Sequence, residues 1–129
     1  EVMCSYNRYE GDPCCGSNRL LTQILRNEWG FKGIVVSDCG AISDFYGENK
    51  HNTHPDATHA SASAVLSGTD VECGSNYGKL PDAVRKGLIP EERLDIRTPS
   101  AKSSFRVGRN GRHPPVEPYS LLGGSFCPT

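Results

Sequence analysis

Residues 34–36 of this 129-residue chain are three consecutive β-branched residues, Ile-Val-Val, without the apolar and polar alternation of a half-exposed strand. Such a run is typical of a parallel strand covered on both faces, because neither face has to be polar. Ser37 and Asp38 follow at once. The sequence therefore predicts a buried strand over residues 31–38 that ends on a carboxylate, in a sheet that is covered on both sides.

Strand-like and helix-like segments alternate along the first 96 residues. Apolar segments at 1–6, 31–38 and 69–74 predict strands. Periodic or Ala-rich segments at 18–29, 55–66, 80–88 and 90–96 predict helices, with a loop at 11–18. In the first helix Asn18 is the expected N-cap and Gly30 the expected stop. This order predicts an α/β fold with a parallel sheet. Three βα units cannot close a barrel, so they would be the C-terminal part of a (β/α)8 TIM-type barrel or a small open sheet.

A change of character after residue 96 divides the chain into residues 1–96 and 97–129. The second part is rich in Arg, Ser, Gly and Pro and has no apolar period, as in a disordered tail. A sharper hypothesis is a shifted reading frame, because permitted codons from residue 96 onward, read one nucleotide later, can encode a continuation of the preceding helix. At the other end, an apolar strand begins directly after Glu1, which we interpret as a cut inside a larger protein.

Charge and residue spacing argue against several classes of partner. With 14 basic and 15 acidic side chains the formal net charge is −1, so nothing favours nucleic acid or an anionic membrane. No apolar run approaches the ~20 residues that span a bilayer. We expect neither a metal nor a cofactor, and only loop or packing roles for the residues that lack zinc-site spacing: His51, His54, His59, Cys14 and Cys15.

Side chains that could take part in catalysis or binding follow the ends of the three predicted strands. In a parallel sheet these ends meet at one edge, where barrel enzymes place their sites. The positions are taken by Tyr6, Asp38, Cys39, Glu72 and Cys73. Asp38 is the candidate catalytic residue, because a carboxylate at the tip of a buried strand needs a polar role; the alternative is a cap for the next helix. Tyr6, one βα unit before Asp38, can point into the same pocket. The alternative is a packed ring with an exposed hydroxyl.

Five segments of the chain carry specific motifs. They read VMCSYN at 2–7, LLTQILRNEWGF at 20–31, GIVVSDC at 33–39, AVLSGTDVECG at 64–74 and AVRKGL at 83–88. Together they closely resemble glycoside hydrolase family 3, above all its β-xylosidase and β-glucosidase members. The resemblance covers residues 1–96 and implies a part of that family's N-terminal (β/α)8 domain. It also implies retaining hydrolysis of a β-linked oligosaccharide or glycoside, with Asp38 as the nucleophile.

The resemblance assigns further expectations to the neighbours of Asp38. Tyr6 matches a family tyrosine beside the nucleophile in the sugar subsite. Cys39 stands where many members carry Trp, and this form resembles the xylosidase-type branch. Because Cys73 ends the next strand, we expect a Cys39–Cys73 disulfide that lines the sugar pocket, or else two small buried thiols. Glu72 is expected to contact a sugar hydroxyl, with a role as a rival nucleophile as the alternative.

The same resemblance places the rest of the active site elsewhere. Family members take further sugar-binding residues from earlier barrel strands, and their acid/base glutamate usually comes from a following α/β domain. A nucleophile without its acid cannot expel a poor leaving group efficiently, so we expect the 129 residues alone to be inactive. Competing hypotheses are a small non-catalytic α/β carbohydrate-binding or interaction module, and a disulfide-rich secreted domain without helices. Compartment, and the choice between xylose, glucose and arabinose, stay open.

Sequencing the source DNA across the codon for Ile96 tests the shifted-frame hypothesis. We expect the insertion or deletion of one nucleotide there, after which the corrected frame continues the helix that begins near residue 91. A reading frame that runs intact to residue 129 would overturn the hypothesis and leave a tail of biased composition.

Overall fold

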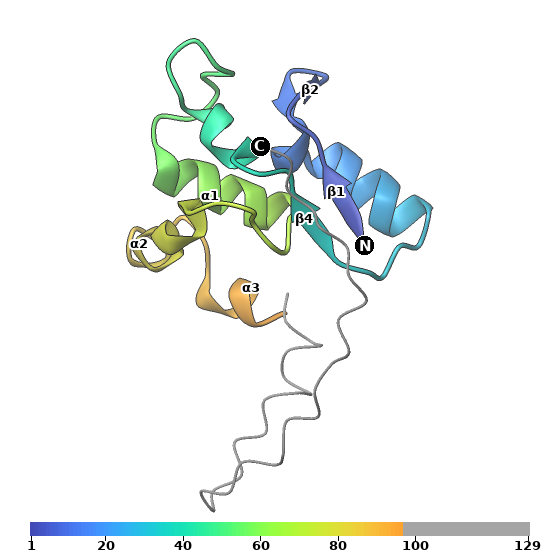
Figure 1. The fold of residues 1–129 in the computed structure, drawn as a ribbon. Coiled ribbons are helices and arrows are strands. Elements are labelled where there is room, and N and C mark those ends of the chain that lie inside the picture. Colours follow the sequence, from blue (N-terminus) through green and yellow to red (C-terminus); the bar gives the residue numbers. More distant parts are fainter. Residues whose placement is uncertain (97–129) are drawn as a thin grey trace, which may run out of the picture. The chain divides into compact units, whose positions relative to one another are not determined.

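Two parallel strands form the centre of the computed structural model, which describes residues 1–96 (Figure 1). β1 (Val2–Cys4) pairs with β4 (Val35–Ser37), so that Met3 lies opposite Val36. On its other side, Val36 forms a single parallel bridge to Val71. The predicted α/β class and the parallel pairing are confirmed.

The third predicted strand, at 69–74, is reduced to that one bridge. The N–H groups of Asp70 and Val71 both donate to Val35 O, at 2.9 and 3.1 Å, and Ser37 N–H donates to Val71 O at 2.9 Å. The chain then leaves the sheet at Glu72, whose carboxylate binds the following turn. This departure limits the pairing to a single residue.

Helices connect the strands where the sequence predicts them. The first is η2 (Arg19–Glu28), a helix of π type in which Trp29 N–H donates to the carbonyl five residues back, Ile24 O, at 2.9 Å. Gly30 ends it with φ 69°, a value that favours glycine. The later helices are α1 (Ala57–Ser67), α2 (Leu80–Arg85) and α3 (Glu91–Ile96).

The start of η2 differs from the prediction. Asn18 has helical backbone angles and makes no side-chain cap bond. Ser17 instead accepts a hydrogen bond from Leu20 N–H through its Oγ, at 3.3 Å, and its carbonyl accepts from Leu21 N–H at 3.0 Å. Because Ser17 is fully buried, its hydroxyl replaces water as the partner of the first helical N–H groups. Asn18 therefore occupies the predicted N-cap position, but its side chain does not cap the helix, and Ser17 supplies the bond instead.

Several short elements lie in segments without a predicted structure. β2 (Arg8–Tyr9) and β3 (Asp12–Pro13) form a small antiparallel hairpin, and η1 (Cys14–Gly16) follows it within the predicted loop. The other two are 3₁₀ helices, η3 (Ala41–Phe45) and η4 (Asn76–Lys79). Elements of two to five residues are too short to produce a recognisable apolar period.

The core lies where α1 packs against η1, η3 and the strands. Its most deeply buried members, none more than 1% exposed, include Val35, Ile42, Phe45, Ala60 and Ala64. The alanines of α1 let neighbouring elements approach closely, as does Gly16 of η1: a Cβ atom on Gly16 would lie 2.8 Å from the Phe45 ring. Small residues therefore set the spacing around this helix.

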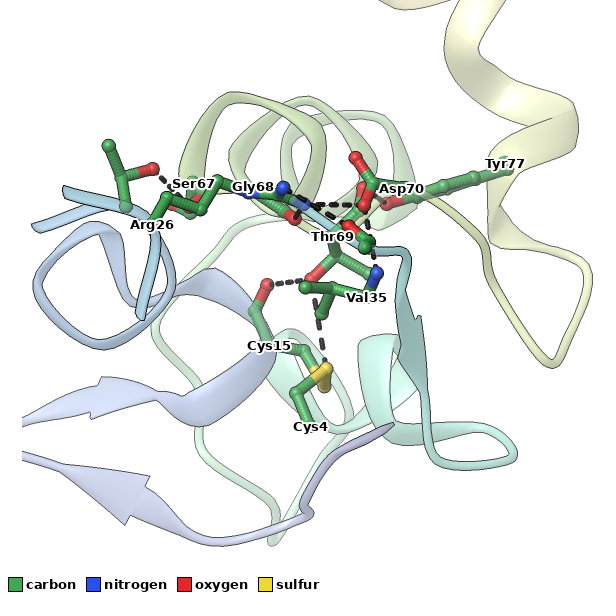
Figure 2. A network of polar contacts seen from close by, with 11 residues as sticks. Cys4, Cys15, Arg26, Val35, Ser67, Gly68, Thr69, Asp70 and Tyr77 are labelled. Carbon is green, nitrogen blue, oxygen red and sulfur yellow. Dashed lines mark hydrogen bonds and ion pairs between the residues drawn. A yellow bond between two sulfur atoms is a disulfide. The ribbon is translucent and has the colours of Figure 1, made fainter. Parts of the chain in front are cut away.

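A polar network joins η2 and the end of α1 to the start of β4 (Figure 2). The Asp70 carboxylate, 8% exposed, accepts from Arg26 Nη2 at 2.6 Å and from Val35 N–H at 2.8 Å. Thr69 Oγ1 donates to Cys15 O at 2.7 Å, and Tyr77 donates through its hydroxyl to Thr69 O at 2.8 Å. These bonds supply partners for buried backbone groups that have no hydrogen bond within the short strand ladder.

The predicted tail, residues 97–129, lies outside the described residues, and so do the hypotheses of disorder and of a shifted frame. Within residues 1–96, none of the helices has both the length and the apolar character required to cross a bilayer.

Replacing Asp70 with alanine tests how far the fold depends on the polar network. The change removes the acceptor shared by Arg26 and Val35 in a partly buried site, so we expect the free energy of unfolding to fall by about 2–4 kcal/mol. Urea unfolding followed by circular dichroism measures it. Asp82→Ala, which removes an exposed acid from α2, is the matched control and should change stability little. Equal midpoints for wild type and Asp70→Ala would contradict the expectation.

Candidate active site

The candidate nucleophile, Asp38, directly follows β4. Its N–H donates to Cys4 O at 3.0 Å, so the backbone ladder with β1 extends through this residue. The side chain is partly exposed, and its Oδ1 accepts from Cys39 N–H at 2.7 Å. The N-cap of η3 is Gly40, which has φ 77° and no side-chain cap bond. Asp38 therefore does not cap the next helix, and its carboxylate is held at the end of the strand.

Tyr6 lies beside Asp38, as the pairing of β1 with β4 requires. The Tyr6 hydroxyl donates to Cys39 O at 2.6 Å and also interacts with the Asp38 carboxylate. Desolvation, then the hydrogen bond and charge of Asp38, and then the charge of Asp44 raise the pKa of Tyr6 above its ordinary value of 10.0. The phenol is thus a neutral donor at physiological pH. The residue is 45% exposed, which disfavours the alternative of a packed aromatic ring.

A disulfide joins the loops that follow β4 and Val71. Cys39 is bonded to Cys73, and Gly40 N–H donates to Cys73 O at 2.7 Å. The expected pairing is present in the structure, and the alternative of two free thiols is not. Because Cys39 directly follows Asp38, the disulfide restrains the backbone that carries the candidate nucleophile.

A second disulfide, between Cys4 and Cys15, is not predicted by the sequence patterns. It joins the end of β1 to η1, and both residues are buried. Cys14 is buried too and is free. The adjacent pair Cys14-Cys15 was a possible signal, but the choice between neighbours depends on where each side chain points. The four longer helices overturn the hypothesis of a disulfide-rich domain without helices.

Glu72, expected to contact a sugar hydroxyl, organises the turn that leads into η4. Its Oε1 accepts from Asn76 N–H at 2.9 Å and from Asn76 Nδ2 at 2.6 Å, while Oε2 accepts from Tyr77 N–H at 2.5 Å. Both carboxylate oxygens are therefore engaged by the protein itself. A sugar contact and a role as rival nucleophile stay predictions that these bonds do not favour.

The segment between η3 and α1, residues 46–56, returns to the end of β1. There His51 Nε2 lies 2.7 Å from Tyr6 O, and Lys50 Nζ lies 3.0 Å from Asp44 Oδ1. For His51 the sequence predicts only a loop or packing role, because the residue lacks zinc-site spacing. The contact with Tyr6 joins two positions that are 45 residues apart. No spacing rule links two positions so far apart, so this contact had no signal in the sequence.

The other two histidines of the segment 51–59 have local partners. The His54 ring packs against Phe45 with ring centroids 5.2 Å apart, and His59 Nδ1 lies 2.9 Å from Asp56 Oδ1. Within the described part of the chain, no three His, Cys, Asp or Glu side chains lie together in a way that could hold a metal ion.

The arrangement places a carboxylate, a phenol and a disulfide at one end of the strand ladder. The carboxylate can act as an oxygen nucleophile or accept hydrogen bonds from hydroxyl groups. The phenol can donate to a developing or existing negative charge. Such a set can bind hydroxyl groups and, through the carboxylate, attack an electrophilic carbon.

Comparisons with known proteins agree with the sequence resemblance. The family model of the glycosyl hydrolase family 3 N-terminal domain matches residues 1–100. A xylan 1,4-β-xylosidase of Xylanibacter ruminicola is 64% identical over 97 residues, which are 74% of this chain and 11% of the relative.

Solved structures show the same likeness. A family 3 exo-β-xylosidase in complex with a xylobiose aziridine activity-based probe matches with a TM-score of 0.68 at 34% identity. A β-glucosidase from Erythrobacter marinus matches with a TM-score of 0.67 at 30% identity. Each match covers 74% of this chain and 13% of the solved one. The chain thus spans 11–13% of the length of these relatives.

A tryptic digest without reductant tests both disulfides. We expect peptide 33–50 linked to peptide 51–79 through Cys39 and Cys73, and peptide 1–8 linked to peptide 9–19 through Cys4 and Cys15. Fragmentation in the mass spectrometer distinguishes Cys15 from Cys14. Cys39→Ser should remove the first link and leave the second as an internal control. Recovery of peptides 33–50 and 51–79 unlinked from oxidised protein would refute the first pairing.

Proposed function

Because this chain belongs to glycosyl hydrolase family 3, we propose that it supplies the nucleophile of a larger enzyme that hydrolyses β-linked glycosides with retention of configuration. The observation that carries the proposal is the position of Asp38. Its carboxylate is partly exposed at the carboxyl end of β4, beside the Tyr6 hydroxyl and next to the Cys39–Cys73 disulfide. Barrel enzymes build their active sites at this end of their strands.

The proposed reaction has two displacements. An oxygen of Asp38 attacks the anomeric carbon while the bond to the leaving oxygen breaks, and a second carboxyl group protonates that oxygen. The resulting glycosyl-enzyme ester is cleaved by water, from which the second group, now a carboxylate, removes a proton. Cys39 N–H holds one Asp38 oxygen at 2.7 Å, and the Tyr6 hydroxyl lies close by. The Cys39 N–H orients one oxygen of the nucleophile before attack, and Tyr6 is tied to the same residue through Cys39 O.

We place residues 1–96 in the C-terminal part of a (β/α)8 barrel. Uncovered apolar surface beside the central ladder supports this placement. Met3 and Trp29 are 60% and 74% exposed, and an apolar cavity of about 200 Å³ lies between β1 and η2. Val71, next to the opposite side of β4, is 47% exposed. Neighbouring βα units of a barrel would bury such surfaces and pair the free strand edges.

The rest of the active site would come from other parts of that larger enzyme. Further sugar-binding residues are expected from earlier barrel strands, and the acid/base glutamate from a following α/β domain. Retaining glycosidases hold their two carboxyl groups about 5–5.5 Å apart, so the missing acid would have to lie beside Asp38. The matched relatives are long enough to contain both parts, because this chain spans 11–13% of their length.

We propose a β-xyloside or a β-glucoside as the substrate. Proteins named as a β-xylosidase and as a β-glucosidase are both similar to this chain, and this supports either sugar. The Cys39–Cys73 disulfide beside Asp38 favours the xyloside, since the cysteine after the nucleophile resembles the xylosidase-type branch. Tyr6 and Cys39 are the proposed sugar contacts.

A chimera tests the proposal directly. Residues 1–96 replace the matching segment of the Xylanibacter ruminicola relative, and hydrolysis of an aryl β-xyloside is measured. We expect the chimera to turn over, and Asp38→Asn to lower kcat by on the order of a thousandfold or more, because an amide is a poor nucleophile. A fluorinated substrate that slows the second step should trap a sugar on peptide 33–50.

Asp82→Asn serves as the matched control, because this exposed acid of α2 pairs only with Arg85 among the described contacts. Its turnover should equal that of the chimera. If Asp38→Asn also turned over normally and no adduct formed, the catalytic proposal would fall. A non-catalytic carbohydrate-binding module would then be the better interpretation.

A further inference from the structure

We propose that His51 is a positioning residue of the glycosidase site, acting through Tyr6; this inference rests on the proposed function. The inference is based on the contact of 2.7 Å between His51 Nε2 and the main-chain oxygen of Tyr6. A carbonyl oxygen only accepts, so the bond requires the proton on Nε2. His51 touches neither Asp38 nor the reacting atoms in the described contacts, and its effect therefore has to pass through the tyrosine.

Tyr6 is held at both of its ends by one stretch of chain. Its hydroxyl donates to Cys39 O at 2.6 Å, and its carbonyl accepts from His51. Both partners belong to the segment between β4 and α1. The backbone around Tyr6 has left the ladder, because the last bond between β1 and the neighbouring strand is the one from Asp38 N–H to Cys4 O. His51 thus supplies an anchor that the sheet no longer provides.

His51 is itself anchored to η3. Its N–H donates to Asp44 O at 2.9 Å, while the neighbouring Lys50 pairs with the Asp44 carboxylate at 3.0 Å. On either side of these two residues the chain turns at Asn49 and Asn52, which have φ of 58° and 50°. Non-glycine residues adopt such values mainly when the surroundings require them. The imidazole is therefore presented to Tyr6 from a defined loop.

The position of Tyr6 matters because its hydroxyl donates to Cys39 O at 2.6 Å, and the N–H of the same residue holds Asp38 Oδ1 at 2.7 Å. A nucleophile has to meet the anomeric carbon with its oxygen correctly placed, and displacements of about 1 Å can cost two orders of magnitude in rate. Loss of the His51 bond frees the main chain of Tyr6 while its hydroxyl keeps a partner. We therefore expect a partial loss of kcat and little change in KM.

The test compares two variants of equal size in the chimera that carries residues 1–96. His51→Gln keeps an N–H donor, whereas His51→Glu offers only acceptors to the Tyr6 carbonyl. We expect kcat to fall about fivefold to tenfold in His51→Glu, as for the loss of one net hydrogen bond, and to stay within about twofold in His51→Gln. His59→Gln, which alters a histidine paired with Asp56, is the control and should match the chimera.

A double-mutant cycle with Tyr6→Phe separates positioning from a general loss of structure. If His51 acts through the tyrosine hydroxyl, His51→Glu should cost much less in the Tyr6→Phe background than in the chimera itself. Equal costs in both backgrounds, or a His51→Glu variant as fast as the chimera, would overturn the inference. Asp38→Asn is measured alongside. If this variant remains active, the proposed function is wrong. If it is inactive, but the effects of His51→Glu and Tyr6→Phe on kcat are additive, only the inference about His51 is wrong.

Discussion

Parallel hydrogen bonds run from β1 to β4 and continue past the last strand residue, where Asp38 N–H meets Cys4 O at 3.0 Å. Beyond that point Gly40 N–H meets Cys73 O at 2.7 Å, on the opposite side of β4. A parallel register brings the carboxyl ends of three consecutive chain segments to one edge. Tyr6, Asp38 and the Cys39–Cys73 disulfide are neighbours for this reason alone. The chemistry of the candidate site is a consequence of the ladder.

The strand ladder is short, and polar and covalent links attach the neighbouring helices to it. Asp70 binds Arg26 of η2 and the first N–H of β4, which adds a polar link between this helix and the strand. The Cys4–Cys15 disulfide ties the end of β1 to η1. A small apolar core supplies limited free energy, and small domains commonly add such links.

Periodicity identified the long elements, because each buries one continuous stripe or face. The helices near 18–29, 55–66 and 80–88 and the strand predicted at 31–38 follow from spacing alone, and their order implies the parallel sheet. The adjacency of Tyr6 and Asp38 follows from that topology. The sequence did not predict the short elements. It also did not predict that Ser17, and not Asn18, binds the first N–H groups of η2. Their hydrogen bonds depend on local burial, which a pattern of residue types does not report.

The amino-acid sequence was sufficient for the α/β class, the family and the carboxylate at the end of β4, because each depends on residue type and spacing along the chain. Three-dimensional packing settled the rest: that Cys4 pairs with Cys15, that Glu72 binds Asn76 and Tyr77, and that His51 reaches Tyr6. These contacts join residues through the paths of loops and the directions of side chains. Loop paths are set by the whole core, so the sequence pattern around each residue carries no record of its distant partner.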